Sequence, residues 1–393
     1  MKRIQNILAT ILFAALPALG QAASGHLIVK AVNKLPFARP SQTIQLTAKD
    51  LEPLAQKNLA RIHVQDAAGK DLLCQAVDTH GDYVPDTVIF QADFAAAETK
   101  TFTVSAGEKW EYNKDQFKAF GRFVRERFDD FAWENDRIAH RMYGQALETW
   151  KNEPLCSSTV DVWSKRTTRL VVNDWYLLEN YHEDNGDGAD FYSAGRSRGN
   201  GGNGIWAADR LWVSRNFTGS RVLACGPIRV MFELTYEPFE VNGISVSEVK
   251  RVTLDAGQNL DHYQSFYKPY TRPGRTAPLT TGIGLRKVDI VQKDLNAERG
   301  TLTAWEPVKE DKKRSGHWGC AVLVDPKLFV KQTEDKLNLL MLAKVPDNNV
   351  TSWWAGFFWD ASGQFAGYEE WKTYVDQSAQ ALQSPIEVSL SAQ

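Results

Sequence analysis

The chain has 393 residues, of which 43% are hydrophobic, and this fraction is ordinary for a globular protein with a sizeable core. Its formal net charge is -2, which disfavours a nucleic-acid binder because such proteins usually carry a basic stripe. We therefore expect no nucleic-acid partner.

The amino terminus has the pattern of an export signal. Lys2 and Arg3 precede an apolar run over residues 7–19, and small residues dominate positions 20–23. The run is too short to span a bilayer, and no later stretch is long and apolar enough to do so. We expect residues 1–23 to be a signal peptide and the protein to be periplasmic or secreted, without an integral membrane segment.

Short runs rich in β-branched and aromatic residues recur along the chain, separated by segments rich in Pro, Gly, Asp and Asn. The predicted strands cover residues 27–33, 43–47, 61–66, 87–92, 101–104, 169–172, 229–236, 246–254, 260–267, 321–325, 337–342 and 386–390. Helices are predicted only over 368–382 and, weakened by Gly121, within 115–127.

Many antiparallel strands with few helices predict a mainly β protein built from two large sheets packed face to face. Residues 24–107 have the pattern of an amino-terminal strand lobe, followed by a connector over 108–130. Because no linker is visible, we expect residues 24–393 to form a single large β-sandwich domain.

Four cysteines, Cys74, Cys156, Cys225 and Cys320, lie far apart in the sequence, which excludes the C-x-x-C spacing of a metal site. An oxidising compartment allows one or two disulfides, with three connectivities if all four pair. Free buried thiols are the alternative.

Residues 131–144 form the first polar and aromatic stretch. As a strand with a bulge near Glu134 and Asp136, the stretch turns His140 towards the core. The opposite face then carries Trp133, Asn135, Arg137, Arg141 and Tyr143. Two guanidiniums, an amide, a phenol and an indole suit a cleft that holds an anionic sugar. The alternative is a structural salt-bridge ladder between sheets.

Residues 181–206 form the second stretch, with four acidic residues, two arginines and seven glycines. Such a loop belongs at a surface or cleft, and its glycines permit close approach of a ligand. His182 is the favoured proton-transfer residue, although a structural role is equally compatible with its position. Arg196 and Arg198 are reserve carboxylate partners. Among the 13 tryptophans, Trp133 and Trp206 adjoin the polar stretches and are expected to hold a sugar ring.

The same loop suggests calcium. Asp184, Asp187 and Asp190 are the candidate metal ligands. The spacing of Glu183, Asn185, Asp187 and Gly188 is that of the first half of a calcium-binding loop, but Ala194 occupies the position of the closing glutamate. No cofactor is required by the sequence, and a calcium site would need ligands from elsewhere in the chain.

The Trp133–Ala139 segment, Tyr143-Gly144, the Tyr181-His182 loop and the segment ending at Trp206 are similar to an uncharacterised-domain family of bacterial polysaccharide-utilisation loci. This resemblance spans most of the chain after residue 23. It implies a galactose-mutarotase-like β-supersandwich that acts on uronic-acid glycans of the pectin or ulvan type. That fold hosts lyases, epimerases and binding modules, so it does not decide the function.

The leading hypothesis is a lyase or dehydratase that acts on uronic-acid oligosaccharides by β-elimination. Arg137 and Arg141 would neutralise the carboxylate, and Tyr143 and His182 would move protons. The alternatives are a sugar epimerase or mutarotase, a glycoside hydrolase that pairs Glu134 or Asp136 with an acid of residues 183–190, or a non-catalytic glycan-binding protein.

Overall fold

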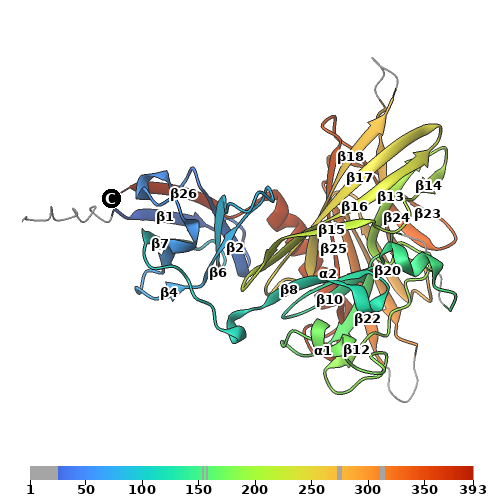
Figure 1. The fold of residues 1–393 in the computed structure, drawn as a ribbon, viewed down its shortest axis with the longest axis horizontal. Coiled ribbons are helices and arrows are strands. Elements are labelled where there is room, and N and C mark those ends of the chain that lie inside the picture. The colour runs from blue at the N-terminus through green and yellow to red at the C-terminus, as the bar shows by residue number, and fades with distance from the viewer. Residues whose placement is uncertain (1–24, 153–154, 156–157, 272–276, 310–314, 393) are drawn as a thin grey trace, which may run out of the picture.

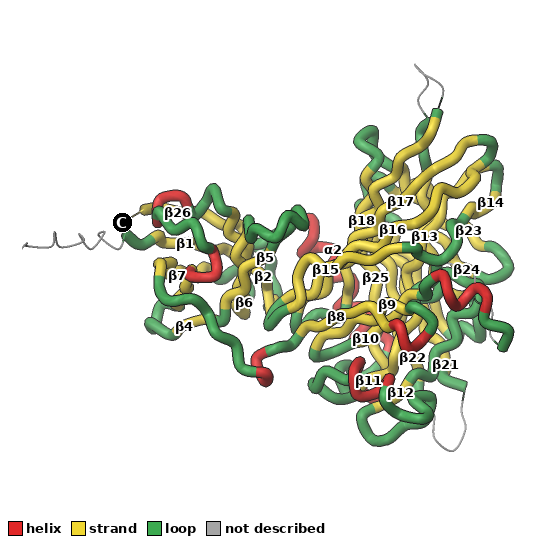
Figure 2. Tube along the Cα trace, in the orientation of Figure 1, coloured by secondary structure: helices red, strands yellow, loops and turns green. Residues whose placement is uncertain are grey.

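The computed structural model describes residues 25–152, 155, 158–271, 277–309 and 315–392, so the predicted signal peptide lies outside it (Figure 1). The described chain forms a small lobe and a large lobe, each with its own hydrophobic core. Strands predominate in both lobes (Figure 2), and the strands pair antiparallel. The prediction of a mainly β, antiparallel sandwich is confirmed.

The small lobe packs two sheets against each other around apolar side chains such as Val29, Phe90 and Val104. One sheet has the order β26 (Glu387–Ala392), β1 (Leu27–Val32), β7 (Thr99–Ala106), β3 (Ile62–Gln65) and β4 (Asp71–Leu72). The other has the order β2 (Arg39–Thr47), β6 (Thr87–Phe94) and β5 (Cys74–Val77). Since β26 comes from the carboxyl end, both ends of the described chain contribute to this lobe. The expected amino-terminal strand lobe is therefore present, whereas the single-domain assignment stays a prediction.

Among the described residues, the large lobe contains three sheets. The largest has the order β15 (Gly219–Cys225), β16 (Arg229–Val241), β17 (Ile244–Asp255), β18 (Leu260–Tyr270), β25 (Val350–Trp359), β22 (His317–Val324), β21 (Thr301–Pro307) and β20 (Gln292–Asn296). A second has the order β14 (Arg210–Trp212), β13 (Asn200–Ala207), β19 (Thr280–Arg286), β24 (Asn338–Lys344) and β23 (Phe329–Glu334). The third has the order β12 (Gly188–Ala189), β11 (Asp161–Lys165), β10 (Ala139–Met142), β9 (Asp130–Asn135) and β8 (Ala119–Val124).

The eight-stranded sheet has two distinct faces because successive side chains along a strand point to opposite sides of the sheet. In β17, Val252 and Leu254 point into the main core, while Arg251 and Thr253, which alternate with them, stay half-buried on the other face. The polar outer face is covered in part by the small lobe and in part by α2 (Tyr368–Gln383).

Helix α2 confirms the predicted carboxyl-terminal helix. Its buried residues Tyr368, Trp371, Val375 and Ala379 follow the spacing of one helical face. This face packs on Ala321 and Phe358 of the eight-stranded sheet, and its first turn carries two glutamates.

The lobes are joined by hydrogen bonds to the buried amide of Gln75. Its oxygen accepts the backbone N–H groups of Ile228 (2.9 Å) and Arg229 (2.8 Å), and its nitrogen donates to the Arg229 carbonyl (3.0 Å). Side chains add further hydrogen bonds between the lobes: Gln91 donates to the Ala256 carbonyl (2.9 Å), and Gln258 donates to the Ser41 carbonyl (2.9 Å).

Three local predictions are wrong. Residues 115–127 form β8 between two 3-10 turns instead of a helix, and Gly121 lets β8 approach Val230 and Trp133. Residues 169–172 are not a strand, because the carboxylate of Glu134 accepts the N–H groups of Val171 and Val172 and starts the short helix α1 (Val172–Tyr176). The remaining 3-10 turns cover Glu52–Leu54, Leu59–Arg61, Gln145–Thr149 and Asp360–Ser362.

The third error concerns residues 131–144, which form the β9–β10 hairpin rather than one bulged strand. Cys74, Cys225 and Cys320 are free thiols, and Cys156 lies outside the described residues. Within the described part of the chain, no helix is long and apolar enough to cross a membrane.

Candidate functional site

The hairpin turn at residues 136–138 changes which side chains share a face. Arg141 pairs with Ala132, and His140 pairs with Trp133, so Arg141 and Trp133 point to opposite sides of the β9–β10 sheet. Trp133 and His140 stack inside the main core. Arg141 faces the smaller cluster that contains Trp163 and α1.

Arg141 is the centre of a buried charge cluster. Its Nε donates to Asp161 Oδ2 (2.8 Å), its Nη2 to Asp190 Oδ2 (2.7 Å), and its Nη1 lies 3.7 Å from Asp130 Oδ2. The side chain of Arg141 is 5% exposed, and those of the three aspartates are at most 1% exposed. Three carboxyl groups around one guanidinium, nearly out of water, constitute an electrostatically costly arrangement of the kind that gathers at functional sites.

The cost of burial is visible in the titration of these groups. Burial raises the pKa of Asp130 to about 7 and raises the pKa of Asp190 well above its usual range, although Arg141 opposes both shifts. Burial and the neighbouring Asp161 carboxylate raise the pKa of Tyr143, whose hydroxyl donates to Asp161 Oδ2 (3.0 Å). Tyr143 is therefore a neutral, buried donor that holds Asp161 in place.

Two groups connect this cluster to the surface. The hydroxyl oxygen of Tyr181 accepts hydrogen bonds from Arg141 Nη1 (3.1 Å) and Arg127 Nε (2.8 Å). His182 lies beside it, with ring centroids 4.5 Å apart and a side chain that is 47% exposed. Nδ1 of His182 lies 3.1 Å from the carbonyl oxygen of Asp190 and 3.3 Å from its Oδ2.

These contacts determine the protonation pattern of His182. A carbonyl oxygen can only accept a hydrogen bond, so Nδ1 carries the proton and Nε2 keeps its lone pair. Burial lowers the pKa of His182 below its ordinary value of 6.5, although the bond to Asp190 opposes this shift. At neutral pH the imidazole is thus a neutral base with a fixed tautomer.

Aromatic residues border this part of the surface. Phe128 and Trp150 stack with centroids 4.5 Å apart, and the guanidinium of Arg127 lies 5.0 Å from the Trp150 ring. Both aromatic side chains are half-buried. Phe128 and Asp129 adopt φ angles of 48° and 64°, an uncommon backbone conformation for such residues that is often found near functional sites.

The predicted site residues are only partly brought together. Arg141, Tyr143, His182 and Asp190 belong to one cluster, as described above. Arg137 does not join it: its Nη1 donates to the Gly257 carbonyl (3.4 Å), and its guanidinium lies 5.8 Å from the Phe365 ring.

The predicted ring-binding residues lie elsewhere. The Trp133 indole is buried and donates to Asp261 (2.7 Å), and the Asn135 amide donates to the carbonyls of Asp255 (2.7 Å) and Gln258 (2.8 Å). Trp206 is half-buried in β13, in the second sheet. These positions give Trp133 and Asn135 structural roles.

The two reserve arginines also separate. Arg196 is exposed, whereas Arg198 is buried and donates to the Ser158 carbonyl (2.8 Å). Burial lowers the pKa of Arg198 to about 10. Neither side chain contacts the Arg141 cluster in any hydrogen bond or ion pair of the described residues.

The three aspartates of the calcium pattern bind three different arginines. Asp184 pairs with Arg166, Asp187 with Arg169, and Asp190 with Arg141. Across residues 25–392, apart from the undescribed gaps, no group of three or more His, Cys, Asp or Glu side chains is placed to hold a metal ion. The carboxylates therefore do not converge as calcium ligands must.

The carboxylates considered for hydrolysis have structural partners. Glu134 is fully buried and binds Lys165 Nζ (2.9 Å) in addition to the start of α1. Asp136 accepts the backbone N–H of Gly257 (2.7 Å).

Sequence reasoning missed several members of the cluster. Tyr181 directly precedes His182, so its position was a usable signal, whereas Asp130, Asp161, Arg127 and Trp150 carry no local pattern that distinguishes them. Asp130 and Asp161 enter the site because β9, β10 and β11 pair side by side, whereas Arg127 ends the 3-10 turn before β9 and Trp150 follows the 3-10 turn Gln145–Thr149.

Comparisons with other proteins match nearly the whole chain. A family described as a domain of unknown function (DUF4861) matches residues 32–388. A relative from Formosa agariphila, named Uncharacterized protein P7, is 29% identical over 386 residues, which are 93% of this chain and 94% of the relative.

Two solved structures from Enterococcus faecalis give a partial structural match. An alpha-mannosidase aligns with a TM-score of 0.49 and 10% identity, and a protein in the Glycosyl Hydrolase Family 38 with a TM-score of 0.47 and 11% identity. Each alignment covers 93% of this chain but only 46% and 47%, respectively, of the solved chains. The chain thus spans less than half the length of either structure.

Proposed function

The chain belongs to the DUF4861 family, and we propose that it is an enzyme that acts on uronic-acid-containing oligosaccharides by β-elimination. The observation that carries this proposal is the adjacent pair of Tyr181 and His182. One side chain has a phenolic oxygen held by two guanidiniums, and the other has a ring nitrogen free to accept a proton.

In the proposed reaction, Nε2 of His182 removes the proton from the carbon next to the sugar carboxylate. The electrons of that C–H bond form a carbon–carbon double bond, and the bond between the neighbouring carbon and its oxygen substituent breaks. The hydroxyl of Tyr181 gives its proton to the departing oxygen. The products are an unsaturated uronate and either a shortened saccharide or water, which corresponds to a lyase or a dehydratase.

The guanidiniums of Arg127 and Arg141 lie where the proposed reaction places negative charge. Arg127 and Arg141 donate to the Tyr181 oxygen, so they stabilise the negative charge that develops there when the phenol loses its proton. Arg127 also lies beside the half-buried Phe128–Trp150 pair, where a sugar ring can stack. The substrate carboxylate is therefore assigned to Arg127 instead of to Arg137.

Tyr143 has a positioning role in this proposal. Its buried hydroxyl fixes Asp161, which orients Arg141, and Arg141 reaches Tyr181. We therefore assign the proton-donor role to Tyr181 instead of to Tyr143, which was predicted from the sequence. His182 keeps its predicted role in proton transfer. A periplasmic or secreted location and a galactose-mutarotase-like fold accord with this function and belong to the same proposal.

The test is incubation of the full chain with a panel of uronic-acid oligosaccharides, followed by mass spectrometry and ultraviolet absorption. β-Elimination gives products that absorb near the ultraviolet edge, with cleavage or loss of water. Release of a reducing sugar without an unsaturated product would instead show hydrolysis and contradict the proposal.

A further inference from the structure

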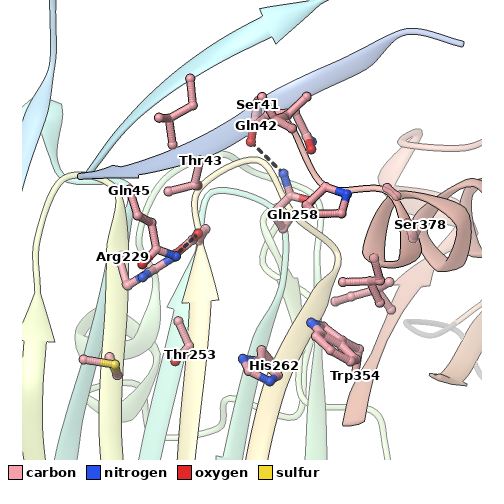
Figure 3. Close-up of a pocket in the computed structure, with 18 of the residues that line it drawn as sticks. Ser41, Gln42, Thr43, Gln45, Arg229, Thr253, Gln258, His262, Trp354 and Ser378 are labelled. Carbon is pink, nitrogen blue, oxygen red and sulfur yellow. Dashed lines mark hydrogen bonds and ion pairs between the residues drawn. The ribbon is translucent and has the colours of Figure 1, made fainter. Parts of the chain in front are cut away.

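A second polar site lies between the two lobes, on the outer face of the eight-stranded sheet. It is a groove of about 690 Å³, within the range of about 300–1,000 Å³ typical of small-ligand sites. Strand β2 forms one side, strands β16, β17, β18 and β25 form the floor, and α2 closes the end near Ser378 (Figure 3). None of the residues that line it belongs to the Arg141 cluster.

Arg39 gives this groove its charge. The residue is 6% exposed, and its guanidinium donates to Gln42 Oε1 (3.0 Å) and to the Ser384 carbonyl (2.9 Å). In the described structure it has no ion pair with a carboxylate, and its Nη2 makes no hydrogen bond. Burial lowers the pKa of Arg39, which is the effect expected for a guanidinium whose charge is not compensated.

The other two arginines of the groove differ from Arg39 because each has an acidic partner. Arg229 forms two hydrogen bonds with Asp255 (2.6 and 2.8 Å), and Arg251 forms two with Glu233 (3.0 and 2.6 Å). Arg39 is thus the guanidinium of the groove that is left for an external anion. A charge-assisted hydrogen bond to that anion would offset the cost of burying it.

The floor offers the contacts that a sugar ring uses. The rings of His262 and Trp354 are stacked nearly parallel, with centroids 4.5 Å apart at 11° (Figure 3). Burial lowers the pKa of His262 to about 4, so its imidazole is neutral, and its Nε2 has no hydrogen-bond partner among the described residues. The amides of Gln45 and Gln264 also line the groove and make no side-chain hydrogen bond within the described chain.

We infer that the groove between the lobes binds an acidic sugar unit, with its anionic group on Arg39 and its hydroxyl groups on Gln45 and Gln264. Carboxylates of uronic acids and sulfate esters share this chemistry, because both present oxygen anions to a guanidinium. The site is separate from the Tyr181–His182 pair. It would hold a second part of a long glycan or a second chain, and it does not require the proposed elimination.

Isothermal titration calorimetry on the full chain tests this inference with three ligands of equal length: a uronate oligosaccharide, a neutral-sugar oligosaccharide carrying sulfate esters, and an uncharged oligosaccharide. The background is the His182→Gln variant, which prevents turnover under the proposed mechanism. We expect saturable binding of at least one acidic ligand and none of the uncharged one. Which acidic ligand binds identifies the anion.

Two substitutions locate the binding. Arg39→Gln removes the charge and is expected to weaken binding about tenfold or more. Gln264→Glu places a carboxylate in the groove without breaking a hydrogen bond of the described residues, and it is expected to weaken binding by a similar factor. Gln332→Glu is the matched control. Gln332 is also a half-buried strand glutamine, but it lies in β23, which belongs to the five-stranded sheet that contains β13 and not to the floor of the groove.

Four results would overturn the inference: binding of neither acidic ligand, equal binding of the uncharged one, unchanged affinity in Arg39→Gln and Gln264→Glu, or equal weakening by Gln332→Glu. The outcome is distinguishable from that of the proposed function. Gln264→Glu in the wild-type background should keep turnover of short oligosaccharides, since the Tyr181–His182 pair lies outside the groove.

Discussion

Replacing Tyr181 with phenylalanine is the most informative perturbation of the candidate site. The substitution keeps the ring that packs on Trp163, with centroids 5.6 Å apart, and removes only the hydroxyl that Arg127 and Arg141 share. It deletes the proposed proton donor while the neighbouring base stays in place.

The structure sets the size of both expected effects. Loss of a general acid lowers the rate by about 100- to 10,000-fold. Arg141 keeps its hydrogen bonds to Asp161 and Asp190, so only the bonds from Arg127 and Arg141 to the hydroxyl are lost. The unfolding free energy should therefore fall by about 1–3 kcal/mol. Catalysis should therefore fall much further than stability.

The assay follows the absorbance of the unsaturated uronate for the rate and chemical denaturation for the stability. Tyr176→Phe is the matched control. Tyr176 also packs on Trp163, with centroids 4.9 Å apart, but its hydroxyl donates only to Asp130 over 3.4 Å. If Tyr181→Phe kept a rate within a few fold of that of Tyr176→Phe, the role of Tyr181 as the acid would be refuted.

Three further predictions concern pH and stability. The rate should fall in acid as His182 becomes protonated, and the midpoint of this fall should lie below pH 6.5 because burial lowers the pKa of His182. A pH–rate profile of kcat/KM measures this midpoint, and a value above 6.5 would contradict the prediction. Asp130 has its pKa raised from 3.8 to about 7 by burial, so the folded state takes up a proton in that range and stability should fall as pH rises from about 4 to 7. Urea unfolding at several pH values should find this slope reduced in Asp130→Asn, and an identical slope would argue against it. Gln75→Ala leaves two buried backbone N–H groups unpaired and should lower the unfolding free energy by about 2–5 kcal/mol. A loss below about 0.5 kcal/mol, which is typical of a surface substitution, would show that Gln75 does not join the lobes.

The fold class was predictable because its signals are local. Alternation along β17 and the helical spacing of Tyr368, Trp371 and Val375 both appear in the sequence, and both elements form where expected. The short helix α1 was not predictable in this way. Its first N–H groups are satisfied by Glu134, which lies more than thirty residues earlier, so tertiary contact overrode the β-branched pattern of residues 169–172.

The candidate site was predictable only in part, for a similar reason. His182 and Arg141 stand out as polar residues in aromatic surroundings, and the structure links them through Asp190. The turn at residues 136–138 reversed the chain and placed Trp133 on the face opposite Arg141, because a change of register exchanges the faces of a strand. Partners such as Asp161 depend on strand pairing, which the sequence pattern does not reveal.

The most direct test of β-elimination is turnover of a uronate oligosaccharide in heavy-oxygen water, with product masses determined before and after prolonged incubation. Elimination breaks the carbon–oxygen bond without adding water, so the unsaturated product should carry no heavy oxygen from the reaction. His182→Gln should give no product. Incorporation of one heavy oxygen into a saturated product at the cleavage step would show hydrolysis and contradict the account.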